Sequence, residues 1–266
     1  MVRKYMKPVS LEEAERELAA NPRARLLAGG TQILSSEFRD REIDAVNVAD
    51  LLPRGIERTE DGTLRLGAAA TFQDLVDSPL VPDVLKDAAR GMANRNVRNA
   101  ATVGGNLGAN KSCSSLIPPF LVLGARVRVH GRADLVPAEK WLVDPKGILT
   151  YVEIPETPGL RGAYGRWSRT ACDLSVLTCA VAYGSEDGTL RGVRIACGGL
   201  DSRSRRFPEL ERLFEGSPKP ERNASVAAVK PLLSPRDDPR GSAAFKRLRA
   251  AELITDALLG ANEEAL

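Results

Sequence analysis

The chain has few of the residues that build metal centres, and it lacks a long apolar run. His130 is its only histidine, and its four cysteines contain no C-x-x-C pair, so the ligand spacings typical of zinc and iron–sulfur sites are missing. No window approaches ~18 consecutive apolar residues, and no apolar segment of a signal peptide follows the first basic residues. We therefore predict a cytoplasmic protein with reduced cysteines, no resident metal and no membrane insertion.

Charge of one sign is also scarce. The 266 residues carry a formal net charge of +3, which is too small to indicate binding of nucleic acid. Hydrophobic residues make up 43% and charged residues 27% of the chain, a composition that favours a folded globular protein over a disordered one. Residues 201–249 hold twelve basic and seven acidic residues, which favours a solvated surface over a docking site for an acidic partner.

Caps, glycines and apolar periodicity predict alternating strands and helices in three successive parts. Ser10 and Glu13 form a capping box before the first helix, and Thr31 is placed to cap the second. Thr71 with Asp74 starts a further helix in the same way. Strands are predicted over residues 24–27, 43–48, 63–69, 148–155, 173–184 and 190–200, and helices over 11–20, 31–38, 71–76, 80–93, 207–216 and from Ser242 onward. The turn at residues 185–188 predicts that the last two strands form a hairpin.

Two pairs of adjacent glycines are the strongest local signals. Gly29-Gly30 lies between Ala28 and Thr31, and Gly104-Gly105 follows Thr102-Val103. Glycine permits positive φ and lets a ligand approach the backbone, so successive amides can converge on an anion, and a helix beginning at Thr31 would add the positive end of its dipole. We predict a phosphate-bearing ligand, while two simple turns remain the alternative.

Neither glycine pair belongs to a standard nucleotide-binding motif. The spacing G-x-G-x-x-G is absent. Residues 105–112 resemble a P-loop, but Asn110 replaces the required glycine and Pro118-Pro119 interrupt the helix that should follow. A G-x-S-x-G elbow is also absent, and His130 has no placed partner, so neither ATP hydrolysis nor a hydrolytic triad is expected.

Five segments resemble, in order, the landmarks of one family over nearly the whole chain. They are KPVSLEEAERELAANPRARLLAGGTQIL, VRNAATVGGNLGANKSCSSLIPPFLVLGA, ILTYVEIP, ACGGL and RGSAAFKRLRAAELITDAL. Together they resemble the FAD-binding subunit of molybdenum hydroxylases, a group that includes the medium subunit of carbon monoxide dehydrogenase and the flavin domain of xanthine dehydrogenase.

The resemblance implies an α+β fold and a role in a larger enzyme. A two-part FAD-binding α/β region of the vanillyl-alcohol-oxidase (PCMH) type would cover residues 1–55 and 56–160. A C-terminal α+β domain with a small antiparallel sheet would cover residues 161–266. The implied partners are an iron–sulfur subunit and a molybdopterin subunit, and the implied function is to pass electrons from the iron–sulfur clusters to a soluble acceptor such as NAD, a quinone or oxygen.

The resemblance also implies the residues that hold FAD, and it requires no catalytic acid or base from this chain. Leu149 would pack near the isoalloxazine ring, and Arg166 lies about where the family often has a lysine near the flavin. The pyrophosphate would lie against two segments, one formed by Leu27, Ala28, Gly29, Gly30, Thr31, Gln32 and Ile33, the other by Thr102, Gly104, Gly105 and Asn106.

Two positions depart from the family pattern, which commonly has an aspartate at Gln32 and an acidic residue at Ser115. Gln32 still donates and accepts hydrogen bonds. Ser115 lacks a carboxylate, and losing a charge-assisted hydrogen bond costs roughly 1.5–3 kcal/mol, or about ten- to hundredfold in affinity. An alternative function is therefore an assembly subunit with a weakened or lost flavin site. A free-standing flavin oxidase is less favoured, because 266 residues leave little room for a substrate domain.

Overall fold

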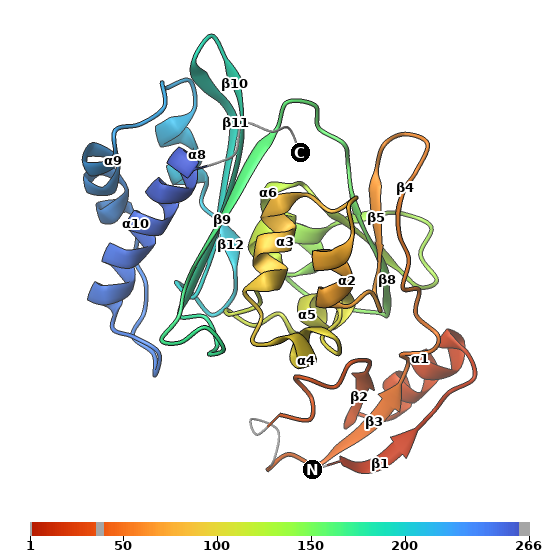
Figure 1. The fold of residues 1–266 in the computed structure, drawn as a ribbon. Coiled ribbons are helices and arrows are strands. Elements are labelled where there is room, and N and C mark those ends of the chain that lie inside the picture. Colours follow the sequence, from red (N-terminus) through yellow and green to blue (C-terminus); the bar gives the residue numbers. More distant parts are fainter. Residues whose placement is uncertain (1, 36–39, 261–266) are drawn as a thin grey trace.

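The computed structural model describes residues 2–35 and 40–260, which form three β-sheets with covering helices (Figure 1). The first sheet is parallel, in the order β1-β3-β2, with strands Val2–Met6, Ile43–Asn47 and Ala24–Leu27. Helix α1, Leu11–Ala20, begins as predicted, because the Ser10 hydroxyl accepts a hydrogen bond of 3.2 Å from the Glu13 amide. It covers one face of the sheet, where Ala14 and Val46 are fully buried.

The second sheet is antiparallel, in the order β4-β5-β8-β6-β7. Its strands are Ile56–Arg58, Leu64–Gly67, Leu149–Ile154, Arg126–Val129 and Val136–Pro137. Its helices are α2 Phe72–Asp77, α3 Asp83–Arg90, α4 Arg95–Arg98, α5 Val103–Ala109, α6 Ile117–Val122 and α7 Ala138–Trp141. Helix α2 starts at the predicted capping box of Thr71 and Asp74.

The third sheet is antiparallel, in the order β12-β11-β10-β9. The predicted hairpin is confirmed: β10 Leu177–Glu186 and β11 Thr189–Gly198 are joined at Asp187-Gly188, where both residues have positive φ. The outer strands are β9 Arg161–Trp167 and β12 Arg205–Arg206. The helices that follow are α8 Pro208–Phe214, α9 Arg222–Val229, the 3-10 helix η2 Lys230–Leu232 and α10 Ala243–Gly260.

The second and third sheets enclose a layer of helices, and the last helices cover the far face of the third sheet (Figure 1). Helix α3 contacts β9, and α6 contacts β10 and β11, while α8 and α10 contact this third sheet from its other side. The core around α6 therefore extends to the buried alanines Ala180, Ala182 and Ala196 of the third sheet. Each sheet lies within one of the three predicted segments, and we keep the domain boundaries at 55/56 and 160/161 as a proposal.

Two predicted features differ in the structure. Of the helix predicted over 31–38, residues 31–35 form turns, in which the Leu34 amide donates to the Gly30 carbonyl at 3.0 Å, and residues 36–39 lie outside the described part. The second glycine pair does not form a bend, because Gly104 and Gly105 lie in the first turn of α5. The Thr102 hydroxyl caps that helix by accepting from the Gly105 amide at 3.0 Å.

His130 has acidic partners that the sequence did not show. Its Nε2 lies 3.1 Å from Glu12 Oε1 and its Nδ1 lies 3.3 Å from Glu15 Oε1, so the end of β6 is tied to helix α1. Among the described residues, no group of three or more histidine, cysteine or acidic side chains is arranged to hold a metal ion. None of the helices in residues 2–35 and 40–260 combines the length and apolar character needed to cross a membrane.

Candidate flavin site

The first glycine segment presents backbone amides in an accessible turn after β2. Gly30 has a φ of +74°, a left-handed conformation that favours glycine. Within the described residues, the amides of Gly29, Gly30 and Thr31 donate to no protein acceptor, and Thr31 is exposed. Successive free amides around a left-handed residue form a concave site that suits an anion. This segment therefore fits the diphosphate of a dinucleotide.

The first glycine segment packs against the residues just before the second one. A Cβ atom at Gly29 would lie 1.6 Å from the carbonyl oxygen of Ala100 and 2.6 Å from its carbon. Ala100 is two residues before Thr102, the cap of α5. Only glycine allows this approach, since a Cβ atom would overlap backbone atoms.

The second glycine segment does not supply the free amides that the prediction assumed. The amides of Val103 and Gly104 donate to Ala70 and Ala68 at 2.9 and 2.8 Å, and those of Gly105 and Asn106 donate to Thr102. A Cβ atom at Gly104 would lie 2.9 Å from the Cβ of Ala68. Gly104 therefore lets the start of α5 pack on the residue that follows β5, and any phosphate contact here must use other atoms.

Leu149 lies at the start of β8, between the cores of the first two sheets. The preceding Ile148 is buried in the core of the first sheet, whereas Leu149 belongs to the core of the second. The Ala68 amide donates to the carbonyl of Thr150 at 2.8 Å, which connects this strand to the Ala68 residue that Gly104 contacts. Leu149 is only 6% exposed, so little of its side chain is open to a ligand.

Asn106 fixes the loop that carries Ser115. Its side-chain oxygen accepts from the Leu116 amide at 3.2 Å, and its carbonyl accepts from the Ser114 hydroxyl at 3.1 Å. Ser115 is 3% exposed, and its hydroxyl has no hydrogen-bond partner in the described part of the chain. Because buried polar atoms are nearly always satisfied, this hydroxyl fits a site completed by a bound group.

Arg166 stands apart from these contacts, on β9 of the third sheet. Its Nε donates to the Ser175 hydroxyl at 2.8 Å, its other nitrogens donate to the carbonyls of Ala171 and Asp173, and its Cδ packs near Gly91 after α3. Its guanidinium is therefore held in place by the segment that leads into β10. No contact in the described residues joins it directly to the glycine segments.

Tyr164 is a nearby residue that sequence reasoning missed. It precedes Arg166 by two positions on β9, so both side chains point to the same face of the sheet. Its hydroxyl is buried without a partner in the described residues. Burial raises the pKa of Tyr164 well above its usual value, and the nearby Arg166 charge offsets only part of the rise. A single tyrosine outside the predicted strands gives no sign of this environment.

Comparisons with known proteins identify the family of this chain. Residues 1–157 match the family described as FAD binding domain in molybdopterin dehydrogenase, and residues 162–261 match the CO dehydrogenase flavoprotein C-terminal domain. The chain is 31% identical over 258 residues to the uncharacterized protein YgfM of Escherichia coli K12, covering 96% of this chain and 95% of YgfM. It is 29% identical to the putative xanthine dehydrogenase FAD-binding subunit XdhB of the same strain, covering 94% and 92%.

The solved structures lead to the same family. Carbon monoxide dehydrogenase from Hydrogenophaga pseudoflava, in a form that lacks the Mo-pyranopterin moiety of its cofactor, contains a chain that superposes with a TM-score of 0.88 at 25% identity. The match covers 97% of this chain and 96% of that one. The predicted family, the fold class and the cofactor FAD are thereby confirmed. The chain therefore belongs to the FAD-binding subunits of the molybdopterin dehydrogenases, a family of oxidoreductase flavoproteins.

Proposed function

We propose that this chain transfers electrons within a cytoplasmic molybdenum hydroxylase, between the iron–sulfur clusters of a partner subunit and a soluble acceptor such as NAD, a quinone or oxygen. The observation that carries the proposal is the end-to-end match to family members whose names specify FAD-binding subunits and molybdenum enzymes. Partner subunits would hold the iron–sulfur clusters and the molybdopterin, because the described residues of this chain contain no cluster of metal ligands.

The proposed FAD site combines residues of the two glycine segments with Ser115, Leu149 and Arg166. The free amides of Gly29, Gly30 and Thr31 would bind the diphosphate, and the Ser115 hydroxyl would gain a partner. Arg166 would present a fixed positive charge from the third sheet. The remaining proposed contacts are Leu27, Ala28, Gln32, Ile33, Thr102, Gly104, Gly105, Asn106 and Leu149.

This chain's own work is to bind and orient the cofactor. When bound, FAD supplies a ring that takes up and releases electrons. Asn106 orders the Ser115 loop, and the Ala100 carbonyl packed on Gly29 holds the two segments together. No side chain of this chain is assigned as an acid or base.

Purification of the tagged chain from its native host tests the function. We expect it to copurify with subunits that contain iron and molybdenum, and we expect a substrate of the assembled complex to bleach the flavin absorbance under anaerobic conditions. If the complex contained its full molybdenum and bound FAD, but none of its substrates reduced that FAD, electron transfer through this chain would be contradicted.

Ser115 favours a second candidate, an assembly subunit with a weakened flavin site, because the buried hydroxyl stands where the family commonly has an acidic residue. The two candidates differ in their response to loss of FAD. A complex built with Gly29→Ala should assemble but lose transfer to the soluble acceptor if the chain carries electrons. Unchanged transfer in that flavin-free complex would establish the assembly role instead.

A further inference from the structure

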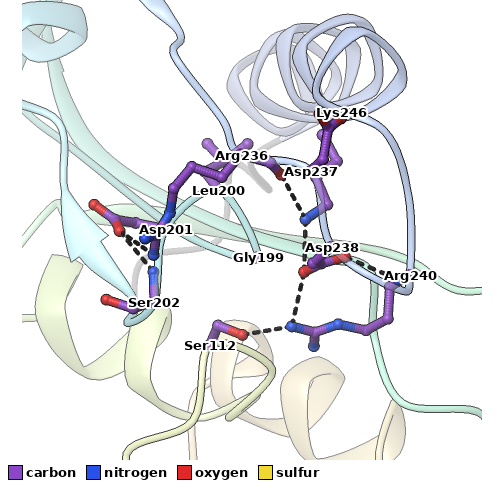
Figure 2. Close-up of a pocket in the computed structure, with 10 residues that line it drawn as sticks. All are labelled: Ser112, Gly199, Leu200, Asp201, Ser202, Arg236, Asp237, Asp238, Arg240 and Lys246. Atoms are coloured by element: carbon purple, nitrogen blue, oxygen red, sulfur yellow. Dashed lines mark hydrogen bonds and ion pairs between the residues drawn. The ribbon is translucent and has the colours of Figure 1, made fainter.

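Arg240 lies in a pocket between the FAD-binding and C-terminal halves of the chain, in the loop before α10. The pocket combines Ser112, from the loop between α5 and α6, with C-terminal residues from segments 199–202 and 236–246. Figure 2 shows the Arg240 guanidinium extending across this boundary toward the Ser112 hydroxyl. Arg240 therefore connects the loop between α5 and α6 with the C-terminal half of the chain.

The charge of Arg240 is paired inside the pocket. Asp238 Oδ2 accepts from Lys246 Nζ at 2.7 Å and from Arg240 Nη2 at 3.2 Å, and the Lys246 side chain is only 2% exposed. Burial alone would raise the pKa of Asp238, but hydrogen bonds from Lys246 and the Arg240 amide, together with both positive charges, hold it below its usual value. The ionised carboxylate thus fixes the guanidinium, and the pairing disfavours a binding site for an anion.

The remaining donors of Arg240 hold two separate segments. Nη2 donates to the Ser112 hydroxyl at 2.7 Å, and Nη1 donates to the Ser175 carbonyl at 3.2 Å. The Ser112 carbonyl also packs on β11, since a Cβ atom at Gly198 would lie 2.5 Å from it. One planar guanidinium can serve two acceptors in fixed directions, which a lysine ammonium does less well.

Both segments lead to residues of the proposed FAD site. Ser112 is three positions before Ser115 in the loop that Asn106 ties down. Ser175 accepts from Arg166 through its hydroxyl, at 2.8 Å, while its carbonyl accepts from Arg240.

We propose that Arg240 is a positioning residue for FAD, which fixes Ser115 and Arg166 relative to each other without contacting the cofactor. The proposal rests on the proposed FAD site.

Equilibrium titration of the full-length chain with FAD, read by flavin fluorescence and visible circular dichroism, tests this role. We expect Arg240→Ala to weaken FAD binding by roughly tenfold and Ser112→Ala to weaken it less, since each removes hydrogen bonds that hold the site. The double variant should bind FAD no more weakly than Arg240→Ala, because both changes break the same connection. Arg240→Lys should fold, retain the ion pair with Asp238 and still show an altered flavin dichroism.

Arg236→Ala is the matched control. Arg236 lines the same pocket and pairs with Asp201 at 3.0 Å, but its side chain is 67% exposed and makes none of the Ser112 or Ser175 contacts. We expect it to bind FAD like the wild type.

If Ser112→Ala and Arg240→Lys both kept the wild-type FAD affinity and flavin dichroism, the positioning role would be overturned while the FAD site stayed intact. The role would also be overturned if Arg236→Ala weakened FAD binding as much as Arg240→Ala. Absence of FAD binding by the wild-type chain would overturn the FAD site itself, and the positioning role with it. If Arg240→Ala does not fold, Ser112→Ala and Arg240→Lys decide the question.

Discussion

Gly29→Ala tests whether the two glycine segments depend on direct backbone contact. Ordinary contacts of a Cβ atom begin near 3.4 Å, whereas this Cβ would lie 1.6 Å from the Ala100 oxygen, so one segment must move by about 1.8 Å. Overpacking that forces the backbone to shift costs roughly 1–3 kcal/mol, and occasionally more. For a chain of this size that corresponds to a fall in Tm of about 2–4 °C per kcal/mol.

The assay compares the flavin-free chain with the flavin-bound chain. Thermal unfolding of the flavin-free Gly29→Ala protein should show the lower Tm, and FAD titration should show a strongly reduced affinity, because the amides of residues 29–31 are displaced. Gly55→Ala is the control, since a Cβ atom there meets nothing within 4 Å and its φ is not positive. An unchanged Tm with lost FAD binding would refute the backbone collision, and would show instead that the methyl group occupies the ligand's own volume.

Three further outcomes follow from the structure. Gly104→Ala should lower the Tm of the flavin-free chain by a few degrees, because the new Cβ atom would lie 2.9 Å from the Cβ atom of Ala68. An unchanged Tm in thermal unfolding would argue against close packing of Gly104 on Ala68. Ser115→Asp should strengthen FAD retention by about ten- to hundredfold, because the added carboxylate would accept a hydrogen bond from the cofactor. Weaker FAD retention after desalting would show that position 115 does not face the cofactor. Hydrogen bonds and charge from Arg3, with a hydrogen bond from Asn21, hold the pKa of buried Asp44 far below its usual value. The ionised Asp44 should therefore stabilise the fold fully above pH ~4, and this stabilisation should be lost as the pH falls further. If Asp44→Asn and the wild type were equally sensitive to acid in pH-dependent unfolding, this contribution of Asp44 would be excluded.

Local signals in the sequence were sufficient for much of the fold. Ser10 and Thr71 start helices where their capping boxes predicted, because a cap is a contact over three residues. The hairpin at Asp187-Gly188 likewise depends on neighbouring residues. The start of α5 is not evident from the sequence, because adjacent glycines are typical of turns, whereas in the structure the Thr102 cap starts a helix there.

The sequence shows where the two glycine segments lie, but not which of their amides are free to donate. The sequence identified both glycine segments, yet which amides remain free depends on Ala68 and Ala70, more than thirty residues before Gly104 in the chain. Contacts between distant segments leave no local pattern, so the approach of Ala100 to Gly29 was not foreseen. The bridge from Arg240 to Ser112 joins residues 128 positions apart and was likewise invisible.

The most direct test of the account is an equilibrium titration of the purified, flavin-free chain with FAD. We expect saturable quenching of flavin fluorescence with one FAD bound per chain, and a marked loss of affinity in Gly29→Ala but not in Gly55→Ala. Quenching that does not saturate, or identical binding by Gly29→Ala and the wild type, would contradict the claim that the paired glycine segments form the cofactor site.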